Sequence, residues 1–285
     1  MRDIRRTLRT AAFIVLVLLV AVSCGPGPTR ETSEPDPSTG TNSAAGSAYG
    51  LPQGDEPVDL DPGEFTINID NPFWPMAPGS QWIYREIDEE GNEREVVVTV
   101  TTETKEIANG ITARVVRDTV TEDGRLIEDT FDWYAQDSTG AIWYLGEDTA
   151  EFDDGEIATT AGSFEAGVDG ALAGIIMPAN PADGMRYRQE YYLGEAEDNG
   201  EILSIDEQAE VPAGHYEDAI LTKDTITIEP DVLEYKLYAR GVGPVLVFGV
   251  SGGGGREDLI VFHSVDEAIA RAAGTTPLGE AYLNE

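Results

Sequence analysis

Alternating apolar and polar positions recur from about residue 80 to residue 264 and predict a succession of β-strands. Within residues 93–105, for example, Val96, Val98 and Val100 share one face of the predicted strand, because successive side chains of a strand point to opposite sides. Turn signals separate the alternating runs, and Asn109-Gly110 is the strongest hairpin signal in the chain. The pattern therefore predicts hairpins of half-buried strands.

No interval between these runs has the length and periodicity of a crossover helix, so we expect neighbouring strands to pair antiparallel. The lengths of the runs favour one strongly curved sheet or half-barrel over a small sandwich. We therefore expect an all-β fold built on a single antiparallel sheet. The runs are 81–87, 93–105, 111–121, 125–136, 141–146, 172–177, 186–193, 202–209, 216–228, 232–238, 245–250 and 258–264.

Two segments outside the strands also have recognisable patterns. Phe73 and Trp74 lie among prolines that exclude regular structure, and we expect them to plug one end of the core. After the last strand, Ser264 and Glu267 form a capping box and Gly274 suits a helix C-cap, which predicts a short C-terminal helix. Its expected apolar stripe is formed by Val265, Ala268, Ile269 and Ala272.

The N-terminus has the pattern of an export signal. Four arginines precede an apolar run at residues 11–22, which is too short to span a bilayer as a permanent helix. The following Ala21-Val22-Ser23-Cys24 resembles the lipobox of bacterial lipoproteins. That resemblance implies cleavage before Cys24, a diacylglyceryl thioether on its thiol and fatty acyl chains such as palmitate. The alternative is an ordinary secreted protein whose lone cysteine lies near the cleavage site.

These patterns divide the chain into four parts. We expect a lipoprotein signal peptide at residues 1–23, and a lipidated Cys24 with a disordered tether at residues 24–64. An antiparallel β domain follows at residues 65–264, with a short helix and tail at residues 265–285. The tether is rich in Gly, Pro, Ser, Thr, Asp and Glu, and such a segment buries too little apolar surface to order itself. The expected location is the extracytoplasmic face of the cell membrane, with the membrane contacted through the lipid anchor.

The charge of the chain narrows its partners. It has 54 acidic and 18 basic residues, and without residues 1–23 the net charge is −39. A field of this sign repels nucleic acid and favours cations and basic proteins, so we expect no nucleic-acid partner. The acidity is equally explained by solubility in a salty habitat or by a generally acidic set of exported proteins. Cys24 is the only cysteine, so we expect no disulfide framework.

Motifs for catalysis and metal binding are weak. Gly249-Val250-Ser251-Gly252-Gly253 fits a nucleophile elbow, but more glycines and a strand follow it where a helix is required. His215 and His263 are too few for a histidine-rich metal site. No acidic run matches an EF-hand loop, although a calcium site assembled from several loops stays open as an alternative. We therefore expect no enzyme, no metal site identifiable from sequence and no resident cofactor.

The strongest concentration of candidate binding residues is aromatic and acidic together, on three predicted strands. One face of these strands must be core, and the other would line a groove for an apolar or glycan ligand. The alternative is that this second face packs under residues 161–184 or the C-terminal helix. The candidate ligand-binding residues are Trp133, Tyr134, Trp143, Tyr144, Tyr191, Asp132, Glu147 and Glu190.

Several motifs resemble a family of uncharacterised exported bacterial β proteins. The resemblance covers about two thirds of the chain and implies a curved antiparallel sheet similar to the open half-barrels of periplasmic lipoprotein carriers. It implies no activity. The motifs are Pro75-x-x-x-Gly79-x-x-Trp82-x-Tyr84, the run Asp132-Trp133-Tyr134-Ala135-Gln136-Asp137, and residues 143–147, 165–167, 189–192, 211–214 and 238–243.

Together these observations predict a membrane-anchored envelope lipoprotein with a non-catalytic acidic β domain that binds a ligand or partner. One alternative is a hydrolase of envelope glycans that uses two carboxylates, which must flank a sugar about 5 to 10 Å apart. With so many acidic residues, the sequence alone selects no such pair. The other alternative is a purely structural or assembly adaptor.

Overall fold

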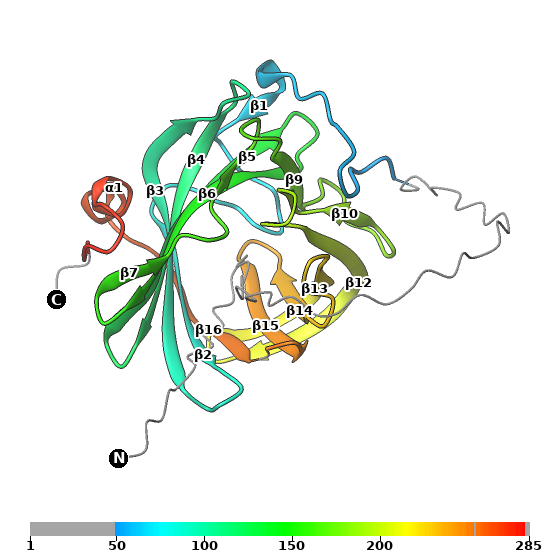
Figure 1. Ribbon diagram of the computed structural model, residues 1–285. Coiled ribbons are helices and arrows are strands. Elements are labelled where there is room, and N and C mark those ends of the chain that lie inside the picture. Colours follow the sequence, from blue (N-terminus) through cyan, green and yellow to red (C-terminus); the bar gives the residue numbers. More distant parts are fainter. Residues whose placement is uncertain (1–48, 254, 283–285) are drawn as a thin grey trace, which may run out of the picture.

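Sixteen strands form a single antiparallel sheet that curls into a nearly closed barrel (Figure 1). The structure, a computed structural model, describes residues 49–253 and 255–282. The signal sequence and Cys24 lie outside the described residues. The predicted all-β fold with one strongly curved sheet and a short C-terminal helix is confirmed.

The strand ladders connect neighbouring strands around the barrel. Starting at β10, the order is β12, β13, β14, β15, β16, β2, β3, β4, β5, β6, β9 and β11, while β1 pairs with β5, and β7 and β8 pair with β6. The elements are η1 (Pro62–Glu64), β1 (Phe65–Thr66), β2 (Ser80–Ile87), β3 (Glu93–Glu106), β4 (Thr112–Glu122), β5 (Arg125–Asp137), β6 (Ile142–Asp153), β7 (Glu156–Thr159), β8 (Phe164–Glu165), β9 (Leu172–Met177), β10 (Arg186–Arg188), β11 (Glu190–Tyr191), β12 (Asp198–Val211), β13 (Gly214–Ile226), β14 (Leu233–Ala239), β15 (Gly243–Ser251), β16 (Arg256–Ser264) and α1 (Glu267–Thr275).

A single short segment, residues 186–191, brings the two ends of the sheet together, and we name it the seam. Its first part, β10, pairs with β12, and its second part, β11, pairs with β9. Between them, the Gln189 amide donates to the Asp198 carbonyl at 2.8 Å. Close approach requires Gly174 in β9, because a Cβ there would lie 2.2 Å from the Gln189 carbonyl oxygen. The seam therefore closes the barrel with few strand pairs.

One end of the barrel interior is aromatic and apolar. Trp74 packs on Tyr134 of β5 and Tyr238 of β14, with ring centroids 5.8 and 5.7 Å away, so it bridges two strands that are not neighbours. Trp74 and Phe73 are both buried. The prediction that these two residues plug one end of the core is confirmed.

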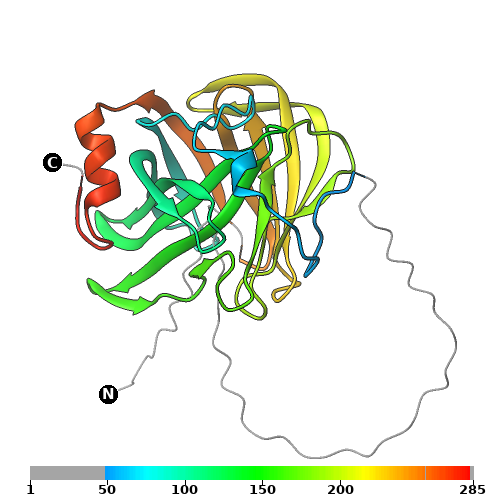
Figure 2. The ribbon, with the colours of Figure 1, turned by 90° about the horizontal axis from the view of Figure 1, so that it is seen from above.

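Helix α1 lies on the outer side of the barrel against β3 and β4 (Figure 2). Its N-cap is Asp266, whose side chain accepts from the Ile269 amide, so the prediction of Ser264 as the capping residue is wrong. The predicted apolar stripe is also displaced, because the buried helix residues are Ala270 and Ala273.

The helix C-cap differs from the prediction as well. It is Thr276, in an extended conformation, while Gly274 lies inside the helix. A Cβ at Gly274 would lie 2.6 Å from the Glu103 side chain and 2.9 Å from that of Thr101. Gly274 therefore allows close packing of the helix on β3 and does not end it.

Residues 52–56, part of the predicted tether at residues 24–64, lie against the barrel at the seam. The Pro52 carbonyl accepts from the Arg188 amide at 2.7 Å. The Arg188 guanidinium donates to the carbonyls of Gly54 and Glu56 at 2.6 and 2.8 Å. These bonds fix residues 52–56 beside β10. Among the described residues, none of the helices has the length and apolarity needed to cross a membrane.

Candidate functional site

The interior of the barrel away from the Trp74 plug is lined by carboxyl groups. Alternation along each strand explains their direction: in β5, for example, Glu128 and Asp132 share the interior face with Tyr134, while Trp133 points outward. Carboxyls reach the same region from most strands around the circumference. The buried members are Glu86, Asp118, Glu128, Asp132, Glu147, Glu190, Asp198, Asp224 and Glu257.

Several of these carboxyls are direct cross-strand partners. Glu257 faces Glu86 between β16 and β2, and Asp132 faces Glu147 between β5 and β6. Asp224 likewise faces Glu234 between β13 and β14. Like charges directly opposite one another destabilise a sheet. The fold therefore retains an arrangement that lowers its own stability, which is typical of functional sites.

Two cations compensate part of this charge. Arg94 bridges Glu86 at 3.0 Å, Asp88 at 3.0 Å and Glu122 at 3.2 Å. Lys236 lies 2.9 Å from Asp224 and 3.7 Å from Glu234. Arg94 is therefore paired with carboxyls on the β2–β4 side of the interior, and Lys236 with carboxyls on the β13–β14 side.

Four carboxyls near the seam form a group that we name the carboxyl cluster: Asp132, Glu147, Glu190 and Asp198. They come from β5, β6, β11 and β12. Within the described part of the chain, no ion pair joins any of the four to an arginine, lysine or histidine. The cluster is therefore buried without a directly paired cation.

A β-bulge brings Tyr144 into the cluster. Between the partner pairs Tyr134–Tyr144 and Asp132–Glu147, β6 has one residue more than β5. Gly146 takes up this extra residue with a φ of +130°, a conformation that L side chains rarely adopt. As a result Tyr144 and Glu147, which strict alternation would place on opposite faces, both point inward.

The Tyr144 hydroxyl joins two members of the cluster. It lies 2.8 Å from Asp132 Oδ1 and 2.6 Å from Glu147 Oε2. A hydroxyl has one proton to donate, so only one of these contacts is a hydrogen bond from Tyr144 when both carboxyls are ionised. The second becomes favourable when that carboxyl is protonated and donates to the hydroxyl oxygen. The geometry thus accommodates one proton shared by the pair.

Burial raises the pKa of both carboxyls on Tyr144. The pKa of Asp132 rises to about 7, chiefly because burial disfavours the charged form, while the Tyr144 hydrogen bond opposes the rise. Burial and the charge of Asp132 hold the pKa of Glu147 well above its usual range. The pair therefore retains a proton at pH values where exposed carboxyls are ionised.

Glu190 and Asp198 form the second half of the cluster. Burial, followed by the charge of Asp198, raises the pKa of Glu190 well above its usual range. Burial also raises the pKa of Asp198 to about 6, although contact with Glu190 and the charge of Lys236 oppose this rise. Glu190 is 1% exposed and forms its side-chain hydrogen bond with Asp198, so the two carboxyls share a proton, and no other donor group reaches either oxygen of Glu190.

Other interior polar atoms also lack partners. Both carboxylate oxygens of Glu257, the hydroxyl of Tyr187 and Oγ1 of Thr222 have no hydrogen-bond partner. Their residues are at most 1% exposed. Buried polar groups are normally hydrogen-bonded. A group of orphaned atoms on one interior surface therefore indicates a place for water or a ligand.

The predicted binding residues divide between the two faces of the sheet. The structure brings Asp132, Glu147, Glu190 and Tyr144 together in the interior, and Tyr134 stacks on Tyr144 with ring centroids 5.0 Å apart. The other three lie on the outer side. Trp133 packs under the Lys105 ammonium at 4.2 Å, Trp143 donates to Asp137 at 2.8 Å, and Tyr191 is partly exposed.

Sequence analysis did not identify the remaining interior carboxyls as site residues. Asp198, Glu257 and Asp118 lack aromatic neighbours of the kind used to choose candidates. A usable signal was present, because carboxyls alternate in phase with core residues: Glu257 with Leu259, and Glu234 and Lys236 with Tyr238. Acidic residues in phase with core positions indicate a polar interior, whereas those out of phase indicate a solvated face.

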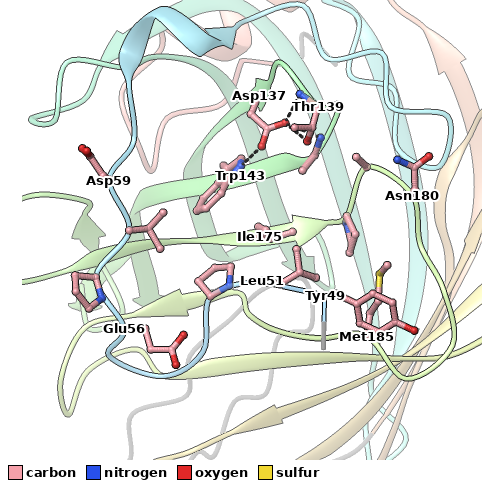
Figure 3. A pocket seen from close by; sticks show the side chains of 17 residues that line it. Tyr49, Leu51, Glu56, Asp59, Asp137, Thr139, Trp143, Ile175, Asn180 and Met185 are labelled. Carbon is pink, nitrogen blue, oxygen red and sulfur yellow. Dashed lines mark hydrogen bonds between the residues drawn. The ribbon is translucent and has the colours of Figure 1, made fainter. Parts of the chain in front are cut away.

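Trp143 lines a separate groove of about 630 Å³ on the outer side of the barrel. Residues 49–59 form one wall, and the strands β6 and β9 contribute Trp143 and Ile175 to the other (Figure 3). Asp137 accepts from the Trp143 indole and from Thr139, so its carboxylate is already engaged. The groove has few free polar groups to select a ligand.

Within the described residues, no group of three or more His, Cys, Asp or Glu side chains is placed to hold a metal ion. The expected alternative of a calcium site assembled from several loops stays a prediction. His263 is engaged by Gln81 at 2.8 Å, and His215 lies 3.9 Å from Glu217 at the surface.

Comparisons with known proteins leave the family open. No protein-family model matches the chain, and no curated protein matches it in sequence. A solved structure from Bacteroides fragilis, assigned as an exported protein with a YmcC-like fold, is similar over 67% of this chain and 99% of its own, with 15% identity and a TM-score of 0.40. A second, from Parabacteroides distasonis and assigned as a lipoprotein, is similar over 67% and 98%, with 11% identity and a TM-score of 0.36. The functional argument therefore rests on the residues of the chain itself.

Proposed function

We propose that the protein is an envelope lipoprotein, anchored by Cys24 to the extracytoplasmic face of the cell membrane, whose β domain binds a ligand in the acidic interior of its barrel without catalysis. The observation that carries the binding function is Glu190, a buried carboxyl whose hydrogen-bond partner is a second carboxyl, Asp198, and which no amide, hydroxyl or cationic group reaches. Once this pair is ionised, neither oxygen of Glu190 has a donor, and buried polar groups are normally hydrogen-bonded.

Support for the anchor comes from the sequence. The lipobox-like residues 21–24 follow an apolar run of export-signal length, and Cys24 is the sole thiol. Two or three acyl chains, at about 0.8 kcal/mol per buried methylene, hold a protein on a membrane almost permanently. Intact-mass measurement of the full chain after expression in a bacterium should show a mass increase of diacylglyceryl size. Cys24→Ser should lose this increase and move to the soluble fraction, and an unmodified Cys24 would refute the anchor.

Support for ligand binding comes from the free energy that the unpaired polar groups of the barrel interior cost the folded protein. An unmade hydrogen bond at a buried polar group costs about 1–3 kcal/mol, and Glu257, Tyr187 and Thr222 each present such a group. They face the interior of the same barrel as the like-charge pairs. A ligand that donates hydrogen bonds there would offset both the unmade hydrogen bonds and the repulsion between the like charges. A core with only a structural role would gain nothing from keeping either.

The test is native mass spectrometry of the full chain, extracted from its membrane in mild detergent. We expect a bound small molecule on the wild type and its loss from Glu190→Gln, with the control Glu156→Gln, on the exposed strand β7, keeping it. A bare polypeptide for the wild type, from several growth conditions, would refute ligand binding and favour the adaptor.

One observation favours a second candidate function, the carboxylate-dependent hydrolase. Asp132 and Glu147 share Tyr144, and a pair that holds one proton provides an acid and a base in one place. If this candidate is correct, Asp132→Asn and Glu147→Gln should each abolish the hydrolysis of envelope glycans by the purified chain. Absence of any turnover by the wild type would exclude it.

A further inference from the structure

We infer that the ligand of the barrel interior is a linear organic polyamine, bound through its ammonium groups by the carboxyl cluster beside the stacked rings of Tyr134 and Tyr144. This inference rests on the proposed binding function and specifies its ligand class. The cluster lacks positive charge and hydrogen-bond donors, and its division into two pairs favours a ligand that supplies both at separate points along a chain.

The missing charge is positive. The charges of Asp132 and Asp198 raise the pKa of both Glu147 and Glu190, so the four carboxyls lie close together. Arg94 and Lys236 have carboxyl partners of their own elsewhere in the interior. A ligand that binds the ionised cluster must therefore bring cationic groups with it.

The missing hydrogen bonds are donors. Glu190 and Asp198 share a hydrogen bond only while one of them keeps its proton. When the cluster is ionised, Glu190 lacks a donor on both oxygens, and Glu147 Oε1 and Asp198 Oδ1 lack one each. An alkylammonium group has several N–H donors and no acceptor, so it satisfies carboxylates without adding an unsatisfied atom. Neutral glycans supply donors but no charge, and they also bring acceptor oxygens that the carboxylates cannot satisfy.

The shape of the site favours an extended organic cation over a metal ion. The cluster consists of two pairs, Asp132 with Glu147 on one side and Glu190 with Asp198 on the other, and no three of these groups converge on one metal position. A polyamine places separate ammonium groups along a methylene chain, so each pair can bind its own group. Tyr134 and Tyr144 provide aromatic surface next to the carboxyls for the methylene chain and for cation–π contact.

Polyamine binding has a pH dependence with a definite sign. Burial raises the pKa of each carboxyl in the cluster, so the free protein retains protons there. Lys236 favours ionisation of Asp198, whereas the acidic neighbours of the cluster oppose ionisation. These neighbours are Asp118, Glu128, Asp224 and Glu229. A bound cation stabilises the ionised carboxyls, so binding releases protons and weakens as the pH falls.

The experiment is isothermal titration calorimetry of the full chain in detergent with spermidine as the probe. At pH 8.0 we expect saturable binding, weaker by about tenfold or more at pH 5.5, and weaker by a similar factor in Glu190→Gln and Glu147→Gln. Glu156→Gln, the same change on an exposed strand, should bind as the wild type does. Titrations in Tris and in phosphate at one pH should give different heats, because protons are released to the buffer.

Asp132→Asn replaces Glu190→Gln or Glu147→Gln if either of these fails to fold. Melting curves show whether each variant is folded. Spermidine binding that all three amide variants leave unchanged would place the polyamine on the outer acidic surface and overturn the inference. If Ca²⁺ or a chitin oligosaccharide binds with the predicted sensitivity to these variants and spermidine does not, the polyamine class is wrong while the binding function stands. If no probe binds and the protein extracted from cells carries no small molecule, both the polyamine inference and the proposed binding function are wrong.

Discussion

At the scale of single residues, Tyr144 shows how one hydroxyl can join two buried carboxyls and oppose the rise that burial causes in their pKa. The sequence placed Asp132, Glu147, Glu190 and Tyr144 among the candidates because aromatic and acidic residues are concentrated around them. It could not separate them from Trp133, whose strand neighbours are the same. Which face of a strand becomes the interior is decided by packing across the whole barrel, and local composition does not contain that information.

Tyr144→Phe removes the hydroxyl between Asp132 and Glu147 and leaves both carboxyls buried without it. We expect the free energy of unfolding at pH 7.5 to fall by about 1–3 kcal/mol, measured by urea denaturation. Tyr191→Phe, on the partly exposed outer side, should change it by less than about 0.5 kcal/mol. Equal effects of the two substitutions would show that the contacts of the Tyr144 hydroxyl with Asp132 and Glu147 contribute nothing to stability.

At the scale of elements, the bulge in β6 determines what the strand presents to the interior. Strict alternation puts Tyr144 and Glu147 on opposite faces, and this is what the sequence predicts for any regular strand. At Gly146 the extra residue shifts the alternation of inward and outward side chains by one position. Strand positions were therefore predictable from the pattern, but the pairing of Tyr144 with Glu147 depended on an irregularity that the pattern does not mark.

Gly146→Ala tests the bulge. The new Cβ would lie 2.2 Å from the Phe164 carbonyl oxygen, at a φ that disfavours any side chain, so β8 or the bulge must move. We expect destabilisation of about 2 kcal/mol or more by urea unfolding, together with loss of ligand from the cluster. The matched control is Gly155→Ala, which has a φ of +82° but open space around the Cβ. A cost no larger than that of the control would contradict the role of the bulge.

The C-terminal helix is held by a buried arginine of β4. Arg117 forms two contacts with Asp129 and donates to the carbonyls of Ala273 and Thr276 at 3.1 and 2.9 Å. Asp129 also accepts from the Gly279 amide at 2.8 Å. This anchor joins the C-terminal segment to the outer side of the barrel, and no motif in the sequence marks it.

Arg117→Ala leaves Asp129 buried and without its cation, so we expect a loss of about 3–5 kcal/mol in unfolding free energy. Limited proteolysis should then cut after residue 264 before it cuts the barrel strands. Arg271→Ala, which removes an exposed pair with Glu267, should cost at most about 0.5 kcal/mol. Proteolysis that is equally slow in both variants would show that helix packing alone holds the chain end.

At the scale of the whole molecule, acidity lies inside the barrel as well as on its surface. Composition alone predicted a net negative protein and therefore cationic partners, but it could not locate the charge. The all-β fold and the single curved sheet followed from period-two runs and turn signals, and the aromatic plug followed from Phe73 and Trp74 among prolines. Closure of the barrel through the seam did not, because the run 186–193 predicts one continuous strand, whereas the structure divides it into β10 and β11, which pair with different strands.

The interior carboxyls make stability fall as pH rises, opposite to the usual effect of paired carboxylates. The pKa values of Glu86, Asp132 and Glu234 are raised to about 7, mainly by burial. The folded state therefore holds protons that the unfolded chain has released above about pH 4.5, and this stabilisation is lost as pH rises towards 7. We expect a higher melting temperature at pH 5.0 than at pH 8.0.

Repulsion between surface charges contributes in the same direction, and salt separates the two causes. High salt screens exposed charges far more than buried ones, so a substantial difference in melting temperature should persist in 0.5 M NaCl. The double variant Asp132→Asn/Glu147→Gln should reduce that persistent difference. If 0.5 M NaCl abolished the difference in melting temperature, the surface charges alone would account for it.

The seam also sets the order in which the molecule opens. Its closure depends on three partner pairs between β10 and β12 and two between β11 and β9, whereas β3 and β4 share a long ladder. Regions with few paired residues exchange their amide protons through small local openings. In native-state hydrogen exchange we expect the amides of residues 186–191 to exchange at a free energy well below that of β3 and β4 and nearly independent of low urea.

Because Glu190 belongs to this segment, the same opening would expose the carboxyl cluster to solutes while the other strands stay paired. Seam amides that exchange only by global unfolding would contradict this route. In kinetic terms, the barrel then has a gated site: the rate of ligand uptake reaches a plateau set by the opening of one short segment, however much ligand is present.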